Sequence, residues 1–522
     1  MSKVQSPWIR TVSLNPPSLQ DNTADADRLI RALKSELKTE AIDIDPALLK
    51  TLPDSLRKWE YKAGCILFKD RYRWLLTGVI QDVDSNPVVG LAVDLGTTRV
   101  ALGLLDLKTG RPIAESVFDN PQESVGPDIL TRVHHAGRPE GLKALNALII
   151  SGLNRAIAKL CRSCKVKAQD IHAVTIAGNT VMTHLFMGLN PYWIIREPYI
   201  PVVNKPGIMH SRTLGLRANP QARVLIFPNV GSYFGGDLIA GILFSGLYRD
   251  DKTAILVDVG TNAEVVVGNR NWLMACAGAA GPALESGAAR IGTTAGPGVI
   301  DKIAIHPNSQ EFEIHTIEDL PARGICGSGV IDLAAQLFLA GMIDIRGKLV
   351  PQVCGKRLKA VSGIAHLVVV SAGQSATGED LTFSQVDLDS LIRSKAAMYT
   401  ILRTITASVG VSFNELERFY VAGTFGSFIN PGSAITIGML PDLPLERYIV
   451  LGNSSLAGAI LALQSHKSLE EIDRIRDHIT YMELNVNQEF MNRFSAAKFL
   501  PHTDPARFPS VKVNVRQKDK PQ

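Results

Sequence analysis

Short apolar runs that stop at an aspartate and a glycine occur twice in the chain. Residues 91–100 read LAVDLGTTRV and residues 256–265 read LVDVGTNAEV. Around each phrase, short runs rich in β-branched residues alternate with glycine-containing turns, which is typical of strands joined by hairpins. The repeat therefore predicts an internal duplication at the scale of a domain, in which each phrase forms the first hairpin of a β-rich unit.

Two longer segments follow the helical period instead. Residues 140–164 and 388–409 carry apolar side chains every three or four positions, which predicts helices that pack outside the sheets. In the second of these segments, the predicted buried stripe consists of Leu388, Leu391, Ile392, Tyr399, Leu402, Ile405 and Val409.

The first 88 residues have a pattern of their own. Residues 24–37 predict a short helix, residues 44–59 predict a helix capped by Asp45 with Pro46 in its first turn, and residues 64–80 predict one or two strands. After Pro501 the periodicity is lost. We therefore expect a flexible extension over 1–26, a small α+β domain over 27–88, a first α/β lobe over 89–250, a second lobe over 251–500 and a C-terminal tail over 501–522.

Composition and charge narrow the class of protein. The 522 residues are enough for roughly three or four domains, and 46% apolar with 20% charged residues is typical of a globular protein. A net charge of +5 predicts solubility and gives no reason to expect nucleic acid or membrane partners. The chain has no run of 18 apolar residues and its N-terminus has no signal-peptide pattern, so we expect a cytoplasmic protein.

The six cysteines do not form a metal or disulfide pattern. Cys161 and Cys164 make a single CxxC at the end of a predicted helix, and a four-ligand zinc site would need a second pair. We expect both to be reduced thiols on or beneath the helix, and Cys326 to be a small buried side chain rather than a nucleophile.

The repeated turns carry the candidate chemistry. A carboxylate at the end of a buried strand is costly unless it meets a cation or several donors. In the first turn, Asp94 supplies that carboxylate, Gly96 allows a tight approach, and Thr97 and Thr98 supply donors for phosphate oxygens. Magnesium would be the cation, held through water by the carboxylates and the nucleotide phosphates.

The second turn repeats this arrangement with Asp258, Gly260, Thr261 and Asn262. We expect the two hairpins to bind the phosphates of one nucleotide from both sides, with Asp94 and Asp258 as the catalytic and metal-binding acids. Glu264 could orient the attacking water or could be an exposed strand residue without a role.

A third glycine-rich element follows both turns, at residues 419–442. A predicted strand runs into Gly423, Thr424, Phe425 and Gly426, whose small residues would let the backbone lie against adenine or ribose. A plain strand-to-helix turn would also explain this spacing. Asp237, in the phrase GGDL, is a further candidate to face the nucleotide, and Arg99 is expected on the solvent side.

Several ordered motifs support a family resemblance. VGLAVDLGTTRVALGLLDL, DNPQESVGPDILTRVHHA, IAGNTVMTHLFMGLNP, LVDVGTNAEVVVG, GICGSGVIDLAAQLFLAGMID and VAGTFGSFINPGSAITIGMLP resemble the ATPase domain of the reductive activators of corrinoid proteins. The resemblance covers most of residues 89–510, and residues 27–88 are similar to the small domain that precedes that ATPase. It implies a two-lobed, duplicated ribonuclease H-like fold of the actin, hexokinase and acetate kinase type, with a small N-terminal α+β domain.

The resemblance also implies a function. Such proteins bind ATP and Mg²⁺, dock on the corrinoid protein of a methyltransferase system and promote reduction of Co(II) to Co(I); a homodimer is also suggested. Many carry an iron–sulfur domain, but the cysteines here lack the C-x₄-C-x₂-C spacing, so we expect no cluster in this chain and a separate reductase or ferredoxin as the electron donor.

Two other functions stay open at this point. One is an ATP-dependent phosphotransferase for a small metabolite, which would need a positioned base and a closed substrate pocket. The other is an ATP-controlled interaction protein of the actin or chaperone type. No distinct motif for a metabolite pocket is present in the sequence.

Overall fold

The chain folds into two compact units. The computed structural model describes residues 6–70, 72–232, 234–260, 262–279, 290–306, 309–423, 429–484 and 488–512. Unit 1 comprises Met1–Gly246 and Ser454–Ile479, and unit 2 comprises Leu247–Asn453 and Thr480–Gln522. The predicted second lobe, 251–500, is therefore wrong in one respect, because residues 454–479 pack with the first half of the chain.

Each unit contains a six-stranded sheet, and five of the six strands follow the same plan in both units, while the sixth strand lies at opposite edges of the two sheets. In unit 1 the order is β7-β6-β5-β8-β10-β9, and in unit 2 it is β21-β20-β11-β12-β13-β22. In both, three antiparallel strands are followed by two parallel ones, which confirms the predicted duplication. The strands of unit 1 are β5 (Val89–Leu95), β6 (Arg99–Asp106), β7 (Arg111–Asp119), β8 (Ile171–Gly178), β9 (Ile208–His210) and β10 (Arg223–Ile226). Those of unit 2 are β11 (Ala254–Val259), β12 (Asn262–Asn269), β13 (Trp272–Ala279), β20 (Arg418–Ala422), β21 (Tyr448–Gly452) and β22 (Ile479–Glu483).

The two faces of the unit 1 sheet differ in side-chain size. Alternate residues of β5, among them Leu91, Val93 and Leu95, pack in one core with α3 (Ile129–Ala136), α4 (Pro139–Ser163) and α5 (Thr180–Met187). The opposite face carries small residues, and α12 (Ser454–Gln464) lies directly on it: a Cβ on Gly90 would be 3.0 Å from Leu463, and one on Gly103 would be 3.0 Å from Ile460. Asp94 belongs to this second face, so the strand period places it beneath α12.

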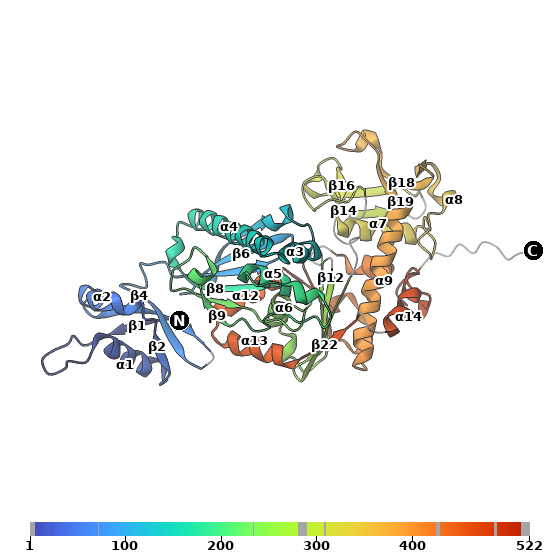
Figure 1. Ribbon diagram of the computed structural model, residues 1–522. Helices are drawn as coiled ribbons and strands as arrows, with labels where there is room; N and C mark the ends of the chain where they lie inside the picture. Colours follow the sequence, from blue (N-terminus) through green and yellow to red (C-terminus); the bar gives the residue numbers. More distant parts are fainter. Residues whose placement is uncertain are drawn as a thin grey trace, which may run out of the picture. The chain divides into compact units, whose positions relative to one another are not determined.

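Helix α12 also crosses α6 (Gly236–Ser245) at very short range. A Cβ on Gly458 would lie 2.0 Å from the Ala240 carbonyl oxygen, so only glycine allows the two backbones to meet (Figure 1). The next helix, α13 (Lys467–His478), completes this inserted segment. Among the described residues, α4 is the helix that is long and apolar enough to cross a membrane, but Leu145 and Ile149 on its apolar face lie in the core of unit 1.

The small domain begins earlier than predicted. Its sheet has the order β1-β3-β4-β2, and β1 pairs residue by residue with β3. Because β1 lies inside the predicted flexible extension 1–26, that prediction is wrong; Ile9 and Val12 are buried. The elements are β1 (Ile9–Ser13), α1 (Asp25–Leu37), β2 (Ile42–Ile44), α2 (Leu52–Lys58), β3 (Lys62–Lys69) and β4 (Trp74–Ile80).

The predicted helix over 44–59 is shorter than expected. Asp45 does accept a hydrogen bond, from the Ala47 amide at 2.9 Å, but the helix starts only at Leu52 after a separate turn. The other oxygen of Asp45 pairs with Arg223 Nη2 at 2.7 Å, and both side chains are buried. Asp45 therefore ties the small domain to the rest of unit 1.

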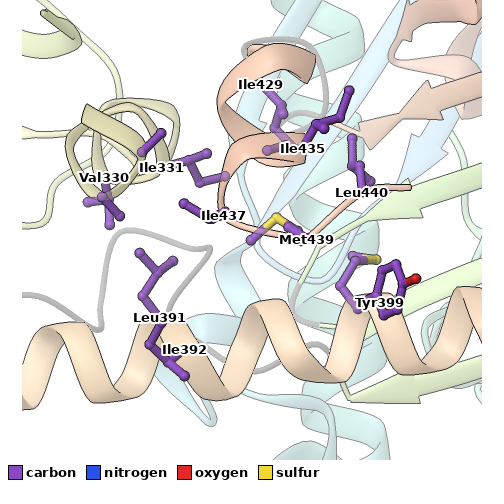
Figure 2. Close-up of a cluster of buried hydrophobic side chains, with 14 of the residues drawn as sticks. Val330, Ile331, Leu391, Ile392, Tyr399, Ile429, Ile435, Ile437, Met439 and Leu440 are labelled. Atoms are coloured by element: carbon purple, nitrogen blue, oxygen red, sulfur yellow. The ribbon is translucent and has the colours of Figure 1, made fainter. Parts of the chain in front are cut away.

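The core of unit 2 surrounds α9 (Gln385–Ser408). Figure 2 shows Leu391 and Tyr399 of this helix facing residues from α7 (Gly327–Leu339) and from the segment 429–440, and Ile392 belongs to the same core. The predicted stripe is confirmed, with Val409 only half-buried. The remaining elements are α8 (Pro351–Cys354), α11 (Pro431–Thr436), α14 (Gln488–Ala497), β14 (Val299–Ile305), β15 (Phe312–Thr316), β16 (Gly324–Ile325), β17 (Leu358–Val361), β18 (Ile364–Val370) and β19 (Leu381–Ser384).

The start of the predicted C-terminal tail belongs to this core. Lys395, which is fully buried in α9, donates to the carbonyl oxygens of Phe499 and Pro501 at 2.5 and 2.7 Å. Phe508 is 2% exposed, and its ring lies 5.4 Å from that of Tyr399, tilted by 43°. The described part of the tail, up to residue 512, is therefore an integral part of unit 2.

Candidate functional site

The first acid lies where β5 ends. Asp94 is half-buried and its Oδ1 accepts a hydrogen bond of 2.7 Å from the Ser455 hydroxyl, at the start of α12. The residue opposite Asp94 on β6 is Ala101. The inserted helix thus binds the carboxylate from one side, and the residue opposite on the neighbouring strand is a small alanine.

The turn after β5 is fixed by its carbonyl groups. Gly96 is required there, because a Cβ would lie 2.2 Å from the Arg99 carbonyl oxygen. The carbonyl of Gly96 accepts from Asn120 Nδ2 at 2.9 Å, that of Thr97 from Arg132 Nη1 at 2.8 Å, and that of Thr98 from the Asn120 amide at 2.7 Å. Three successive carbonyls therefore have partners in the segment that follows β7. As predicted, Arg99 is exposed, and it pairs with Asp119.

The end of β8 adjoins this turn. Asn179 Nδ2 donates to Thr97 Oγ1 at 3.1 Å, while Asn179 Oδ1 caps α5 by accepting from the Met182 amide at 2.9 Å. A Cβ on Gly235 would be 2.4 Å from the Asn179 Cα and 2.6 Å from Asp237 Oδ1. The structure thus brings the first turn, Asn179 and the α6 N-terminus with Asp237 into one neighbourhood.

The second acid lies at the equivalent position of unit 2. Asp258 is half-buried near the end of β11 and pairs in register with Glu264 on β12. Directly opposite residues have Cβ atoms ~5 Å apart on the same face of the sheet. Glu264 is therefore a close neighbour of Asp258, and it is half-buried rather than exposed. In the turn, the Gly260 amide donates to the Asn262 carbonyl at 3.0 Å, and Thr261 lies outside the described residues.

The glycine expected near adenosine lies against this second acid. Gly423 has φ +89°, and a Cβ there would be 2.6 Å from Asp258 Oδ1 and 2.7 Å from the Val259 carbonyl oxygen. The predicted partners Thr424 and Gly426 lie outside the described residues. A contact between Gly423 and the second acid was not predicted from the sequence.

Gly423 has a counterpart in unit 1. Ala177 pairs with Asp94 and Ala422 pairs with Asp258, so Gly178 and Gly423 follow equivalent strand positions. The signal was visible in the sequence, where IAGN at 176–179 matches VAGT at 421–424. The third glycine-rich element is thus the second copy of a feature that unit 1 also has.

Three other site residues were not singled out from the sequence, because they occupy ordinary polar positions. Asn120, Arg132 and Ser455 contact the first turn or its acid; Asn120 and Arg132 lie in one of the quoted family motifs, but the sequence alone gave neither a role at the turn. Arg132 is completely buried. Burial lowers the pKa of its guanidinium, and the nearby carboxylates of Glu123 and Asp128 oppose this shift.

The chain matches one family of known proteins along most of its length. Models of the RACo family match the chain in three consecutive parts: the RACo linker region at residues 7–84, the RACo middle region at 89–250, and the C-terminal ASKHA domain of RACo at 252–512. The chain belongs to the RACo family. Its fold is that of the actin- and hexokinase-like ASKHA proteins, as expected from the resemblance.

Named relatives and a solved structure agree. A solved reductive activator for a corrinoid, iron–sulfur protein is 35% identical, with a TM-score of 0.88 over 98% of this chain and 82% of that one. The corrinoid activation enzyme RamQ of Eubacterium limosum is 29% identical over 80% of this chain and 72% of its own. A [Co(II) methylated amine-specific corrinoid protein] reductase of Methanosarcina barkeri is 20% identical over 77% of this chain and 75% of its own. This RACo chain thus resembles enzymes.

The cysteines of this RACo protein are buried or half-buried thiols. Burial raises the pKa of the Cys161 thiol, which disfavours a reactive thiolate, and Cys164 ends the same helix. Cys326 is 5% exposed and its thiol donates to the Ile300 carbonyl at 3.3 Å, as expected for a buried side chain.

Each acid, taken by itself, suits a magnesium ion that is also bound by water and phosphate better than a metal bound by protein side chains alone. Within the described part of the chain, no three His, Cys, Asp or Glu side chains gather as a metal-ligand group. Magnesium is commonly held by one or two carboxylates together with water and phosphate oxygens. One half-buried aspartate at the end of each central strand suits that chemistry.

Proposed function

We propose that this RACo protein uses ATP and Mg²⁺ to activate a corrinoid protein of a methyltransferase system, promoting the reduction of Co(II) to Co(I). The main support is the duplicated sheet, with an aspartate at the same strand position of both copies and a glycine after the neighbouring strand. The names of the relatives supply the corrinoid substrate. We place the protein in the cytoplasm.

The residues of the two turns would divide the work of ATP hydrolysis. Backbone amides at Thr97 and Thr98 would bind phosphate oxygens, and Asp94 and Asp258 would each hold magnesium through water molecules. The magnesium ion, when bound, neutralises charge on the phosphates. Glu264, opposite Asp258, orients the attacking water and accepts its proton.

Energy and electrons come from different sources in this proposal. The cobalt gains one electron from a separate reductase or ferredoxin, and ATP supplies free energy only. For a one-electron couple ~59 mV corresponds to ~1.4 kcal/mol, so a change that favours reduced cobalt by ~5 kcal/mol would raise its potential by ~200 mV. This requires that nucleotide binds differently to the two conformations of the complex.

A spectroscopic assay tests the proposal. The protein, MgATP, a chemical reductant and a Co(II) corrinoid protein are mixed without oxygen, and the visible spectrum is followed for Co(I). Co(I) should accumulate with ATP and stay low with ADP or without nucleotide. Asp94→Asn and Asp258→Asn should each abolish the ATP-dependent part.

Two results of the same assay would contradict the proposal. If ATP is hydrolysed but none of a panel of corrinoid proteins forms a complex or changes its spectrum, the corrinoid assignment is wrong. If ATP neither binds nor turns over, the nucleotide site itself is wrong.

A further inference from the structure

Three buried polar side chains lie behind the first turn. Asn120 is 1% exposed, and Gln122 and Arg132 are fully buried. They are connected to one another: Asn120 Oδ1 accepts from the Gln122 amide at 3.0 Å, and Gln122 Oε1 lies 3.4 Å from Arg132 Nη1. We call these three residues the polar bracket.

The polar bracket contacts the first turn through the backbone carbonyl groups of the turn. It supplies the donors to the carbonyls of Gly96, Thr97 and Thr98. In a planar trans peptide the N–H points away from the C=O. Fixing these carbonyls therefore turns the following amides, those of Thr97, Thr98 and Arg99, away from the bracket. Successive amides that point the same way form an anion-binding nest.

Arg132 is the only charged member of the bracket, and it has no ion pair within the described residues. Its Nε donates to the Gly126 carbonyl at 2.8 Å and its Nη1 to the Thr97 carbonyl, while its buried Nη2 has no hydrogen-bond partner there. Asp128 caps α3 through the Thr131 amide at 2.9 Å, and both Asp128 and Glu123 act on the guanidinium at longer range without forming an ion pair with it in the described residues, so a positive charge remains beside the turn. Such a charge favours an anion at the turn.

We propose that Arg132 is a positioning residue for nucleotide phosphates: it fixes the Thr97 carbonyl so that the Thr98 amide faces the phosphate, and its charge favours the anion. This inference rests on the proposed nucleotide site and adds a residue that does not itself touch the nucleotide. It predicts that substitutions at Arg132 weaken the binding of nucleotides that carry phosphates and leave the binding of the nucleoside unchanged.

The test compares ligands with and without phosphate. Binding of MgATP, MgADP and adenosine to the full-length protein is measured by calorimetry for the wild type and for Arg132→Gln. Losing a hydrogen bond from a charged group should weaken MgATP and MgADP binding by about tenfold to a hundredfold. Adenosine binding should stay within about twofold. Arg132→Lys keeps the charge but lacks the forked donor geometry, so it should fall between the two.

A matched control separates this effect from the loss of any buried arginine. Arg28 in α1 is 8% exposed and paired with Asp21, away from the turn. Arg28→Gln should lower stability and leave all three affinities unchanged. Equal losses of MgADP and adenosine affinity in Arg132→Gln would mean a general structural role, and would overturn the proposal.

Two further measurements decide the matter if Arg132→Gln does not fold. Met182→Glu places a carboxylate where Sδ now lies 3.4 Å from Nη1, so it pairs with the guanidinium and should weaken MgADP binding at least fivefold. In the wild type, hydrogen exchange at the Thr97 and Thr98 amides should slow with MgADP and not with adenosine. Unchanged exchange with saturating MgADP would overturn the proposal.

The outcomes also separate this inference from the proposed function. Wild-type protein that does not bind MgATP would sink both. Wild-type protein that binds MgATP, with Arg132→Gln equal to it, would sink the inference alone. Phosphate-selective loss in a protein that activates no corrinoid partner would support Arg132 and contradict the corrinoid assignment.

Discussion

The first hairpin holds its acid against a serine of an inserted helix, whereas the second holds its acid opposite another acid. Asp94 faces Ala101 across the strands and accepts from Ser455; Asp258 faces Glu264. The five strands around each acid have the same order and direction in both units. The two acids therefore occupy equivalent positions in the two copies of the duplicated sheet. The residues around them differ, with an alanine and a serine beside Asp94 and a glutamate beside Asp258.

The turns that follow the two acids also differ, in length and in hydrogen bonding. The first has four residues between its last paired positions, 96–99, and takes its hydrogen-bond donors from the polar bracket. The second has three residues, 260–262, and the Gly260 amide bonds within the turn. We infer that the first hairpin mainly binds phosphate, while the second, with two acids, mainly serves the chemical step.

Replacing Glu264 by alanine is the strongest test of this division, because it makes both hairpins alike. Loss of a general base typically lowers turnover by about 10²-fold to 10⁴-fold. We expect kcat for ATP to fall by that amount in Glu264→Ala while the dissociation constant of MgATP stays within about threefold. Glu264→Gln should behave in the same way, and a large rise in the dissociation constant with normal kcat would reverse the assignment.

The paired glycines test whether the two strand ends are equally constrained. Both glycines face close neighbours, since a Cβ on Gly423 would be 2.6 Å from Asp258 Oδ1 and one on Gly178 would be 2.9 Å from the Leu95 Cβ and 3.0 Å from its carbonyl oxygen, but only Gly423 has a left-handed φ, of +89°. Gly423→Ala should therefore lower the free energy of unfolding by about 3 kcal/mol, and Gly178→Ala by about 1 kcal/mol. Hydrogen exchange in β11 and β5 measures each loss, and equal losses would contradict the difference.

The duplication could be predicted because its signal is local. Apolar runs ending at Asp94 and Asp258 mark buried strands that stop at a polar turn, and the strand period sets the face on which each acid lies. The resemblance then supplied the lobes and the nucleotide. Glu264 could be named from its place after the turn, although only the register shows that it faces Asp258.

The features that could not be predicted from the sequence depend on contacts between residues that are far apart in the chain. Nothing near residues 454–479 indicates that this segment packs on β5 and β8, since the cause is the row of small residues on that sheet far earlier in the chain. Arg132 lies on a short helix whose polar residues are typical of a solvated face. Its burial follows from the turn that it binds, and not from its own neighbours in sequence.

A substitution at Asn179 tests the phosphate-binding role of the first hairpin with a smaller expected effect. Asn179→Asp keeps an oxygen to cap α5 but loses the donor to Thr97 and adds negative charge beside the turn. Stability should be unchanged or slightly higher, because aspartate is a good cap at a helix N-terminus. The MgATP dissociation constant should rise about tenfold. Unchanged affinity together with lowered stability would show that Asn179 serves only α5.

The smallest expected effect concerns the helix that reaches Asp94. Ser455→Ala removes the 2.7 Å hydrogen bond to the carboxylate, which should cost about 1 kcal/mol of unfolding free energy and weaken MgATP binding about threefold. The adjacent Ser454 is a matched control: it is 1% exposed, and its hydroxyl has no partner in the described part of the chain. Ser454→Ala should leave binding unchanged and stability equal or higher, since it removes an unsatisfied buried group. Calorimetry and denaturant unfolding of both variants check this, and equal effects would mean that α12 acts by packing alone, so that both acids are set only by their strands.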